Sequence, residues 1–86
     1  MLKVLLIDDE ERASDALRLM IEKTVPAIKQ IMVCNDSRKA ADIIAAYQPA
    51  LVFLDIQMPY MNGFELMEKI PNKNFKIIFT TAYNEY

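Results

Sequence analysis

The chain has 86 residues, the length of one small domain, and a formal net charge of −2. Its acidic and basic residues are interspersed, so the charge pattern provides neither a basic stripe for nucleic acid nor a polybasic patch for a membrane surface. The sequence contains no histidine, which excludes a catalytic triad, a histidine metal ligand and an imidazole base among its own side chains. We therefore treat residues 1–86 as a single domain whose chemistry depends on carboxylates, hydroxyls and lysines.

The first expected element is a strand, because the apolar run from Leu2 to Ile7 is short and stops at Asp8 and Asp9. The start of the chain does not resemble a signal peptide, and no apolar stretch reaches the roughly 20 residues that a membrane span needs. We therefore expect a cytoplasmic protein. Apolar residues at spacings of three and four then predict a helix that ends before Pro26. Its predicted inner face consists of Ala13, Ala16, Leu17, Met20, Ile21 and Thr24.

A second strand is expected from about Ile28 to Cys34, and a second helix follows it. Three residues before that helix offer side-chain oxygens that could cap its first turn: Asn35, Asp36 and Ser37. The helix closes at Pro49, and its predicted inner face consists of Ala40, Ile43, Ile44 and Tyr47.

The third apolar run, Leu51 to Leu54, is the most apolar strand and stops at Asp55. The next segment, Asp55 to Gly63, contains a proline, an asparagine and the only glycine of the chain, so we expect a loop. A short third helix, with inner residues Phe64, Leu66, Met67 and Ile70, ends at Pro71. A fourth strand is predicted from about Phe75 to Thr80.

Strands that alternate with helices predict an α/β fold with right-handed crossovers and a doubly wound parallel sheet. In such sheets ligands bind beyond the carboxyl ends of the strands. Asp8, Asp9 and Asp55 should therefore meet at one edge, together with a hydroxyl from Thr80 or Thr81. Because side chains alternate along a strand, at most one of these two threonines can face the site.

Three carboxylates in close contact repel one another unless a cation lies among them. Hard oxygen ligands without histidine or thiolate favour Mg²⁺ or Mn²⁺ over zinc, and Mg²⁺ keeps water molecules that a phosphoryl oxygen can displace. Asp55 is the candidate nucleophile that would form an aspartyl phosphate. A structural interpretation stays open for each residue: Asp8 and Asp9 could only cap a helix, and Asp55 could be a turn residue.

Three stretches of the sequence resemble the receiver domain of two-component response regulators, and their residues are similar to those of the LytTR type. The stretches are Val4 to Glu10 (VLLIDDE), Leu51 to Pro59 (LVFLDIQMP) and Ile77 to Tyr86 (IIFTTAYNEY). The resemblance implies a flavodoxin-like (CheY-like) sheet and a role in phosphorelay signal transduction. In that role Asp55 accepts a phosphoryl group from the phosphohistidine of a sensor histidine kinase.

The same resemblance implies roles for individual residues. Mg²⁺ would be held by Asp8, Asp9, Asp55 and the main-chain carbonyl of Gln57. The switch hydroxyl that turns toward the phosphoryl oxygens would be that of Thr81 rather than that of Thr80.

The sequence also departs from the family pattern, mainly because the fifth strand and last helices of the family lie beyond Tyr86. We expect strand order 2-1-3-4, and the lysine that closes the family's fifth strand has no equivalent among residues 1–86. The fourth strand would then be an unpaired apolar edge. We expect a homodimer or an exchanged assembly to cover that edge. Smaller departures are Ala50, where many relatives carry an acidic residue, and Tyr60, where glycine is usual.

The sequence thus predicts a phosphoacceptor signalling domain that is not an enzyme and makes no direct contact with nucleic acid. LytTR-type relatives usually carry a DNA-binding domain after the receiver, and no such residues occur here. One alternative is a receiver remnant that interacts with partners without being phosphorylated. Another is a phosphatase of the haloacid dehalogenase type, but such enzymes need a second acid two residues after the nucleophile, where this chain has Gln57.

Overall fold

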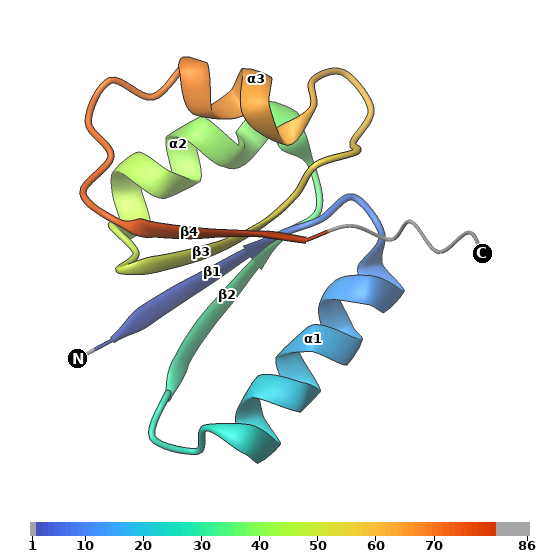
Figure 1. Ribbon diagram of the computed structural model, residues 1–86, viewed down its shortest axis with the longest axis vertical. Helices are drawn as coiled ribbons and strands as arrows, with labels where there is room; N and C mark the ends of the chain where they lie inside the picture. The colour runs from blue at the N-terminus through green and yellow to red at the C-terminus, as the bar shows by residue number, and fades with distance from the viewer. Residues whose placement is uncertain (1, 81–86) are drawn as a thin grey trace.

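The computed structural model describes residues 2–80 and consists of one parallel sheet with helices on both faces (Figure 1). Strands and helices alternate along the chain, as the apolar pattern predicts. In chain order the elements are β1 (Lys3–Ile7), α1 (Glu11–Thr24), β2 (Gln30–Cys34), α2 (Ser37–Tyr47), β3 (Leu51–Asp55), α3 (Gly63–Glu68) and β4 (Lys76–Thr80).

The strands are parallel and lie in the order β2-β1-β3-β4, which confirms the predicted order. Helix α1 covers one face of the sheet, whereas α2 and α3 lie side by side on the other (Figure 1). Ile7, the last residue of β1, is level with Cys34 of β2 and with Leu54 of β3. The carboxyl ends of the two central strands are therefore neighbours, so the residues that follow them must meet at the same edge.

The alternating side chains of β1 and β3 build the core on the two faces of the sheet. Leu5 and Leu54 are fully buried on the face covered by α2 and α3, and Val4 and Leu6 are buried on the face covered by α1. Such strands, apolar on both faces, are what a central parallel sheet requires. The two central strands thus form a rigid support for the loops at their ends.

The inner faces predicted for the helices are only partly right. On α2, Ala40 and Ile44 are buried, as predicted. On α1, however, Met20 is 62% exposed, whereas Ser14, which the apolar pattern passes over, is buried. Helix α1 buries only a narrow stripe against the sheet, and the Ser14 hydroxyl is satisfied there by donating to the carbonyl of Glu11 at 2.9 Å. A pattern of apolar spacings cannot show how wide the covered stripe is.

One strand boundary and one further helix face differ from expectation. Strand β2 begins at Gln30 rather than near Ile28. Phe64 of α3 is 53% exposed, although it was expected on the inner face, and its ring lies against the ring of Phe79 with the centroids 4.8 Å apart.

Within residues 2–80, no helix combines the length and the apolar character that a membrane span demands.

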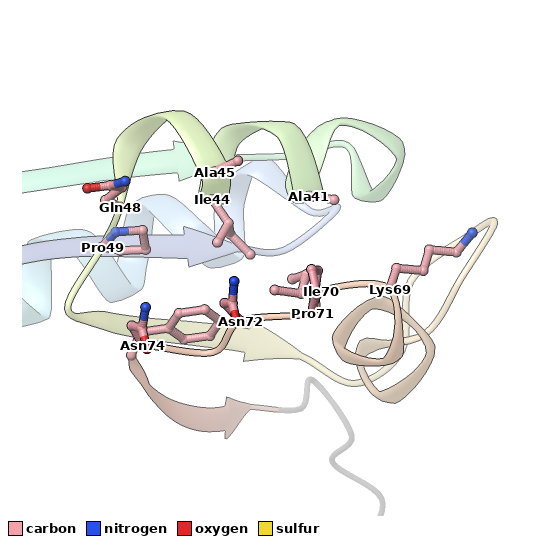
Figure 2. Close-up of a pocket in the computed structure, with 11 residues that line it drawn as sticks. Ala41, Ile44, Ala45, Gln48, Pro49, Lys69, Ile70, Pro71, Asn72 and Asn74 are labelled. Carbon is pink, nitrogen blue, oxygen red and sulfur yellow. The ribbon is translucent and has the colours of Figure 1, made fainter.

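A groove of about 510 Å³ lies between the second half of α2 and the segment that connects α3 to β4. Figure 2 shows Ile44 of α2 facing the segment that carries Ile70 and Asn72. Pro49 and Phe75 also line the groove, and each of them precedes a strand. The groove therefore lies at the amino ends of β3 and β4, away from the edge at which β1 and β3 end.

Candidate functional site

The three aspartates that follow or close the central strands come together at the carboxyl edge of the sheet. Asp8 and Asp9 follow β1, and Asp55 is the last residue of β3. One carboxylate oxygen from each of the three residues lies within 4.8 Å of the others. The predicted convergence of Asp8, Asp9 and Asp55 is therefore present in the structure, and the parallel register of β1 and β3 produces it.

Asp8 is held by backbone contacts in the turn that leads from β1 to α1. Its N–H donates to the carbonyl of Cys34 at 3.1 Å, and its Oδ1 accepts the N–H of Glu10 at 2.9 Å. The N-cap residue of α1 is Glu10, and its side chain makes no capping hydrogen bond. Asp8 and Asp9 are therefore not the N-cap residue of α1, although the Asp8 carboxylate accepts the N–H of that residue at the start of the helix.

Asp55 is the buried member of the cluster, with 3% of its surface exposed. Its Oδ1 accepts the N–H of Gln57 at 3.2 Å, which fixes the direction of the carboxylate. The pKa of Asp55 is raised from 3.8 to about 6. Burial is the largest cause, followed by the negative charge of Asp8; a hydrogen bond with the Asp8 side chain and the charge of Asp9 also raise the pKa, whereas the hydrogen bond from the Gln57 N–H lowers it. The fold therefore keeps this carboxyl group in a site that disfavours its charge.

Across residues 2–80, no lysine or arginine forms a salt bridge with these carboxylates. The two ion pairs in this range join Arg18 to Glu22 and Arg38 to Asp36. Three close carboxylates without a basic partner are the donor set that a hard divalent cation prefers, with oxygen ligands only. The residues present therefore fit Mg²⁺, which Asp8, Asp9 and Asp55 could bind directly.

The structure tests the other expected site residues, Gln57, Thr80 and Thr81, only in part. Gln57 follows β3, and its N–H donates to Asp55 Oδ1. The role of the Gln57 carbonyl as a metal ligand stays a prediction. Thr80 is level with Asp55 in the register of β3 and β4, and its carbonyl accepts the N–H of Ile56 at 3.1 Å. Thr81, the expected switch residue, lies outside the described residues.

Gly63 was expected only as part of a turn, but in the structure it packs against the site. A side-chain carbon at this position would lie 2.7 Å from the main-chain oxygen of Asp55, which is closer than real contacts allow. The Gly63 N–H also donates to the carbonyl of Ile56 at 2.9 Å. The first residue of α3 thus packs directly on the backbone of the candidate nucleophile. The sequence offered one signal for this position, since Gly63 is the only glycine of the chain. That signal does not show which groups the residue contacts.

The site also depends on residues at the junction of β2 and α2 that were expected only to cap the helix. Asp36 is the N-cap of α2, as the sequence allowed, and it accepts the N–H of Arg38 at 2.9 Å. Asn35 and Ser37, in contrast, make hydrogen bonds to the two loops at the carboxylate edge. No sequence signal could have indicated these partners, because they lie 27 and 22 residues away along the chain.

Comparison with known proteins agrees with this geometry. Residues 4–86 match the family described as the response regulator receiver domain. An uncharacterized response regulatory protein of Yersinia pestis is 40% identical over the whole chain, which covers 36% of that protein. The sensory transduction protein LytT of Bacillus cereus is 37% identical, again over the whole chain and 35% of its own length. The chain thus spans about a third of the length of these curated relatives.

Solved structures show the same fold. The MaeR response regulator bound to beryllium trifluoride superimposes with a TM-score of 0.86 over 99% of this chain and 70% of its own, at 24% sequence identity. At this identity the likeness establishes the shared fold and no more. Together with the matching family description over residues 4–86, the strand order and the acidic edge lead to one conclusion. The chain belongs to the response regulator receiver domain family of two-component systems.

Proposed function

We propose that the chain is a phosphoacceptor, in which Asp55 receives a phosphoryl group from the phosphohistidine of a sensor histidine kinase in a Mg²⁺-dependent reaction. The observation that carries this proposal is the buried Asp55 carboxylate, which shares its edge of the sheet with Asp8 and Asp9 and has no basic partner among residues 2–80. Receiver domains are generally signalling domains without enzymatic activity, and we propose the same for this chain.

The proposed transfer uses Asp55 as the nucleophile. A carboxylate oxygen of Asp55 forms a bond to phosphorus while the bond from phosphorus to the kinase imidazole nitrogen breaks, and the nitrogen keeps that electron pair. Asp55 must be ionised for this step, although its pKa in the metal-free site is raised to about 6. When bound, Mg²⁺ would neutralise charge on the carboxylates and on the transferring oxygens. Asp8, Asp9, Asp55 and the carbonyl of Gln57 are the proposed ligands.

The proposed switch is the hydroxyl of Thr81. Support for this assignment comes from its neighbour, since Thr80 is level with Asp55 and its carbonyl is bonded to the N–H of Ile56 beside the site. We infer that Thr81→Ala would leave phosphorylation of Asp55 possible and would reduce the structural response to it.

Intact-mass measurement tests the phosphoacceptor proposal. The full gene product is incubated with acetyl phosphate and Mg²⁺, and we expect a gain of one phosphoryl group that disappears in Asp55→Asn. Asp42→Asn is the matched control, because Asp42 is an exposed acid of α2 away from the cluster. Equal labelling of Asp55→Asn, or no labelling of the wild type, would overturn the proposal. Absence of labelling together with absence of Mg²⁺ binding would support the interaction remnant instead.

The exposed edge of β4 is the basis of a further proposal, on the partner of this chain. Among residues 2–80, β4 pairs on one side only, with β3, and its Ile78 and Phe79 are 45% and 40% exposed. We propose that a second copy or an exchanged segment pairs with this edge. Light scattering checks this, and a monodisperse monomer would contradict it. The cytoplasmic location expected from the sequence stays a prediction.

A further inference from the structure

We propose that the segment 35–38, which comprises the two residues after β2 and the first two residues of α2, is a positioning element that sets the separation of the two loops carrying the proposed Mg²⁺ ligands. None of its four residues is a proposed ligand. The segment contacts the β1–α1 loop through Asn35 and the β3–α3 loop through Ser37 and Arg38. This inference rests on the proposed function, because it concerns the geometry of the same site.

Asn35 makes the contact with the first loop. Its Nδ2 donates to the carbonyl of Asp8 at 2.6 Å and to the Oγ of Ser14 at 3.1 Å. Ser14 is almost fully buried, with 1% exposure, and donates in turn to the carbonyl of Glu11. The Asn35 side chain therefore joins the end of β2 to the main chain of a proposed ligand and to the first turn of α1. Removing the amide would leave the Asp8 carbonyl without this donor.

Ser37 makes the first of two contacts with the other loop. Its Oγ donates to the carbonyl of Pro59 at 2.8 Å, and the residue is buried with 3% exposure. Pro59 lies between Gln57, a proposed ligand, and Gly63, which packs on the backbone of Asp55. The hydroxyl therefore fixes the middle of the loop against the first turn of α2.

Arg38 makes the second contact. Its guanidinium carbon lies 4.1 Å from the centre of the Tyr60 ring, which is within the range of a cation–π interaction. Asp36 holds the same guanidinium with both carboxylate oxygens, through contacts of 3.0 Å to Nε and 3.0 Å to Nη2. A planar guanidinium held in this way has little freedom to rotate away from the ring. The ring of Tyr60 thus rests on a cation that the segment itself orients.

The backbone of Tyr60 shows that this contact holds a strained residue. Its φ is 74°, in the left-handed region that residues other than glycine rarely adopt. The side chain is otherwise largely in solvent, with the residue 73% exposed, so core packing does not impose this conformation. Glycine would adopt this φ without strain. The presence of an aromatic residue here is explained if its stacking on Arg38 helps to hold the loop.

The topology places the segment where it can act on both loops. It leaves the end of β2, which is the neighbour of β1, and enters α2, which lies beside α3 (Figure 1). Mg²⁺ requires near-ideal octahedral geometry, so a small change in the separation of Asp8 and Gln57 lowers its affinity. Residues outside the ligand set that orient ligands typically change metal affinity by about 10-fold to 100-fold when they are removed.

The test measures Mg²⁺ binding to the full gene product by calorimetric titration, well below the unfolding temperature of each variant. We expect Asn35→Ala and Tyr60→Ala to weaken binding by about 10-fold. Tyr60→Phe, which keeps the ring, should stay within about two-fold of the wild type, and Arg38→Gln should add little to Tyr60→Ala because the two residues act as one unit. Asn74→Ala is the matched control, since Asn74 lines the groove at the opposite edge.

Amide hydrogen exchange in metal-free protein provides a readout that does not depend on Mg²⁺. We expect Asn35→Ala to raise exchange of the Glu10 N–H, and Tyr60→Ala to raise exchange of the Gly63 N–H, each by about 10-fold relative to the control. Wild-type protein that binds no Mg²⁺ would overturn the proposed function, and the exchange rates would still decide the inference. Variants that bind Mg²⁺ as the wild type does, or that lower only the unfolding temperature, would overturn the inference alone. Tyr60 is exposed, so its variants test the proposal even if a variant at buried Ser37 does not fold.

Discussion

Replacement of Asp55 by asparagine should stabilise the metal-free protein at neutral pH. The carboxyl group is buried beside the carboxylates of Asp8 and Asp9, and its pKa is raised to about 6. Asparagine has nearly the same shape as the protonated acid and carries no charge. The substitution should therefore remove the repulsion and the desolvation cost that the ionised wild-type side chain brings to the site.

The size and the pH range of the effect follow from the pKa. A carboxyl group whose pKa is higher in the folded state binds its proton more tightly there, so its contribution to stability is complete below pH 3.8 and is lost as the pH rises through about 6. Each pKa unit corresponds to about 1.4 kcal/mol, so the shift from 3.8 to about 6 amounts to roughly 3 kcal/mol. We therefore expect the advantage of Asp55→Asn over the wild type to grow by about 2.5 kcal/mol, most of the full shift, between pH 4 and pH 8.

Urea denaturation in the presence of a chelator measures this difference. The free energies of unfolding of the wild type and of Asp55→Asn are compared at several pH values in that range, because the difference between the two proteins cancels the titration of other groups. Adding Mg²⁺ at pH 8 should stabilise the wild type by mass action and leave Asp55→Asn nearly unchanged. The exposed acid Asp42 again supplies the control variant, Asp42→Asn.

Two results would refute this reasoning. A difference between the two proteins that is the same at pH 4 and at pH 8 would show that Asp55 has no raised pKa in the folded state. An equal response of both proteins to Mg²⁺ would show that the ion binds elsewhere.

Three further predictions concern the neighbours of Asp55. Asp8→Asn should lower the pKa of Asp55, because it removes the adjacent negative charge, and carboxyl carbon chemical shifts followed against pH would detect this; an unchanged midpoint would contradict the electrostatic account. Gly63→Ala should cost about 1–3 kcal/mol in urea denaturation, since the new carbon would lie 2.7 Å from the Asp55 main-chain oxygen, and a neutral effect would mean that the helix moves freely. Leu54→Ala should cost about 2–5 kcal/mol because Leu54 is fully buried, whereas Ile78→Ala, at a residue 45% exposed, should cost much less; similar losses would contradict the described core.

Much of the fold follows from local sequence patterns. Short apolar runs and intervening helical periodicities indicate parallel strands joined by helices, and the structure has these elements in the expected order. Because parallel strands all point the same way, an aspartate at the end of β3 and another just after β1 must share an edge. For this reason the meeting of Asp8, Asp9 and Asp55 could be predicted without coordinates of any kind. The errors concern the start of β2 and the helix surfaces, where Met20 and Phe64 are exposed instead of buried.

The sequence by itself determined the α/β class, the strand-end carboxylates and the family. Only the tertiary structure decided the raised pKa of Asp55, the contact of Gly63 with the Asp55 backbone and the bond from Asn35 to Asp8. Periodicity states which side of a strand or helix is apolar, and it acts over neighbouring residues. Burial of a charge and the separation of two loops depend instead on groups that are far apart along the chain and are brought together only when the helices pack on the sheet.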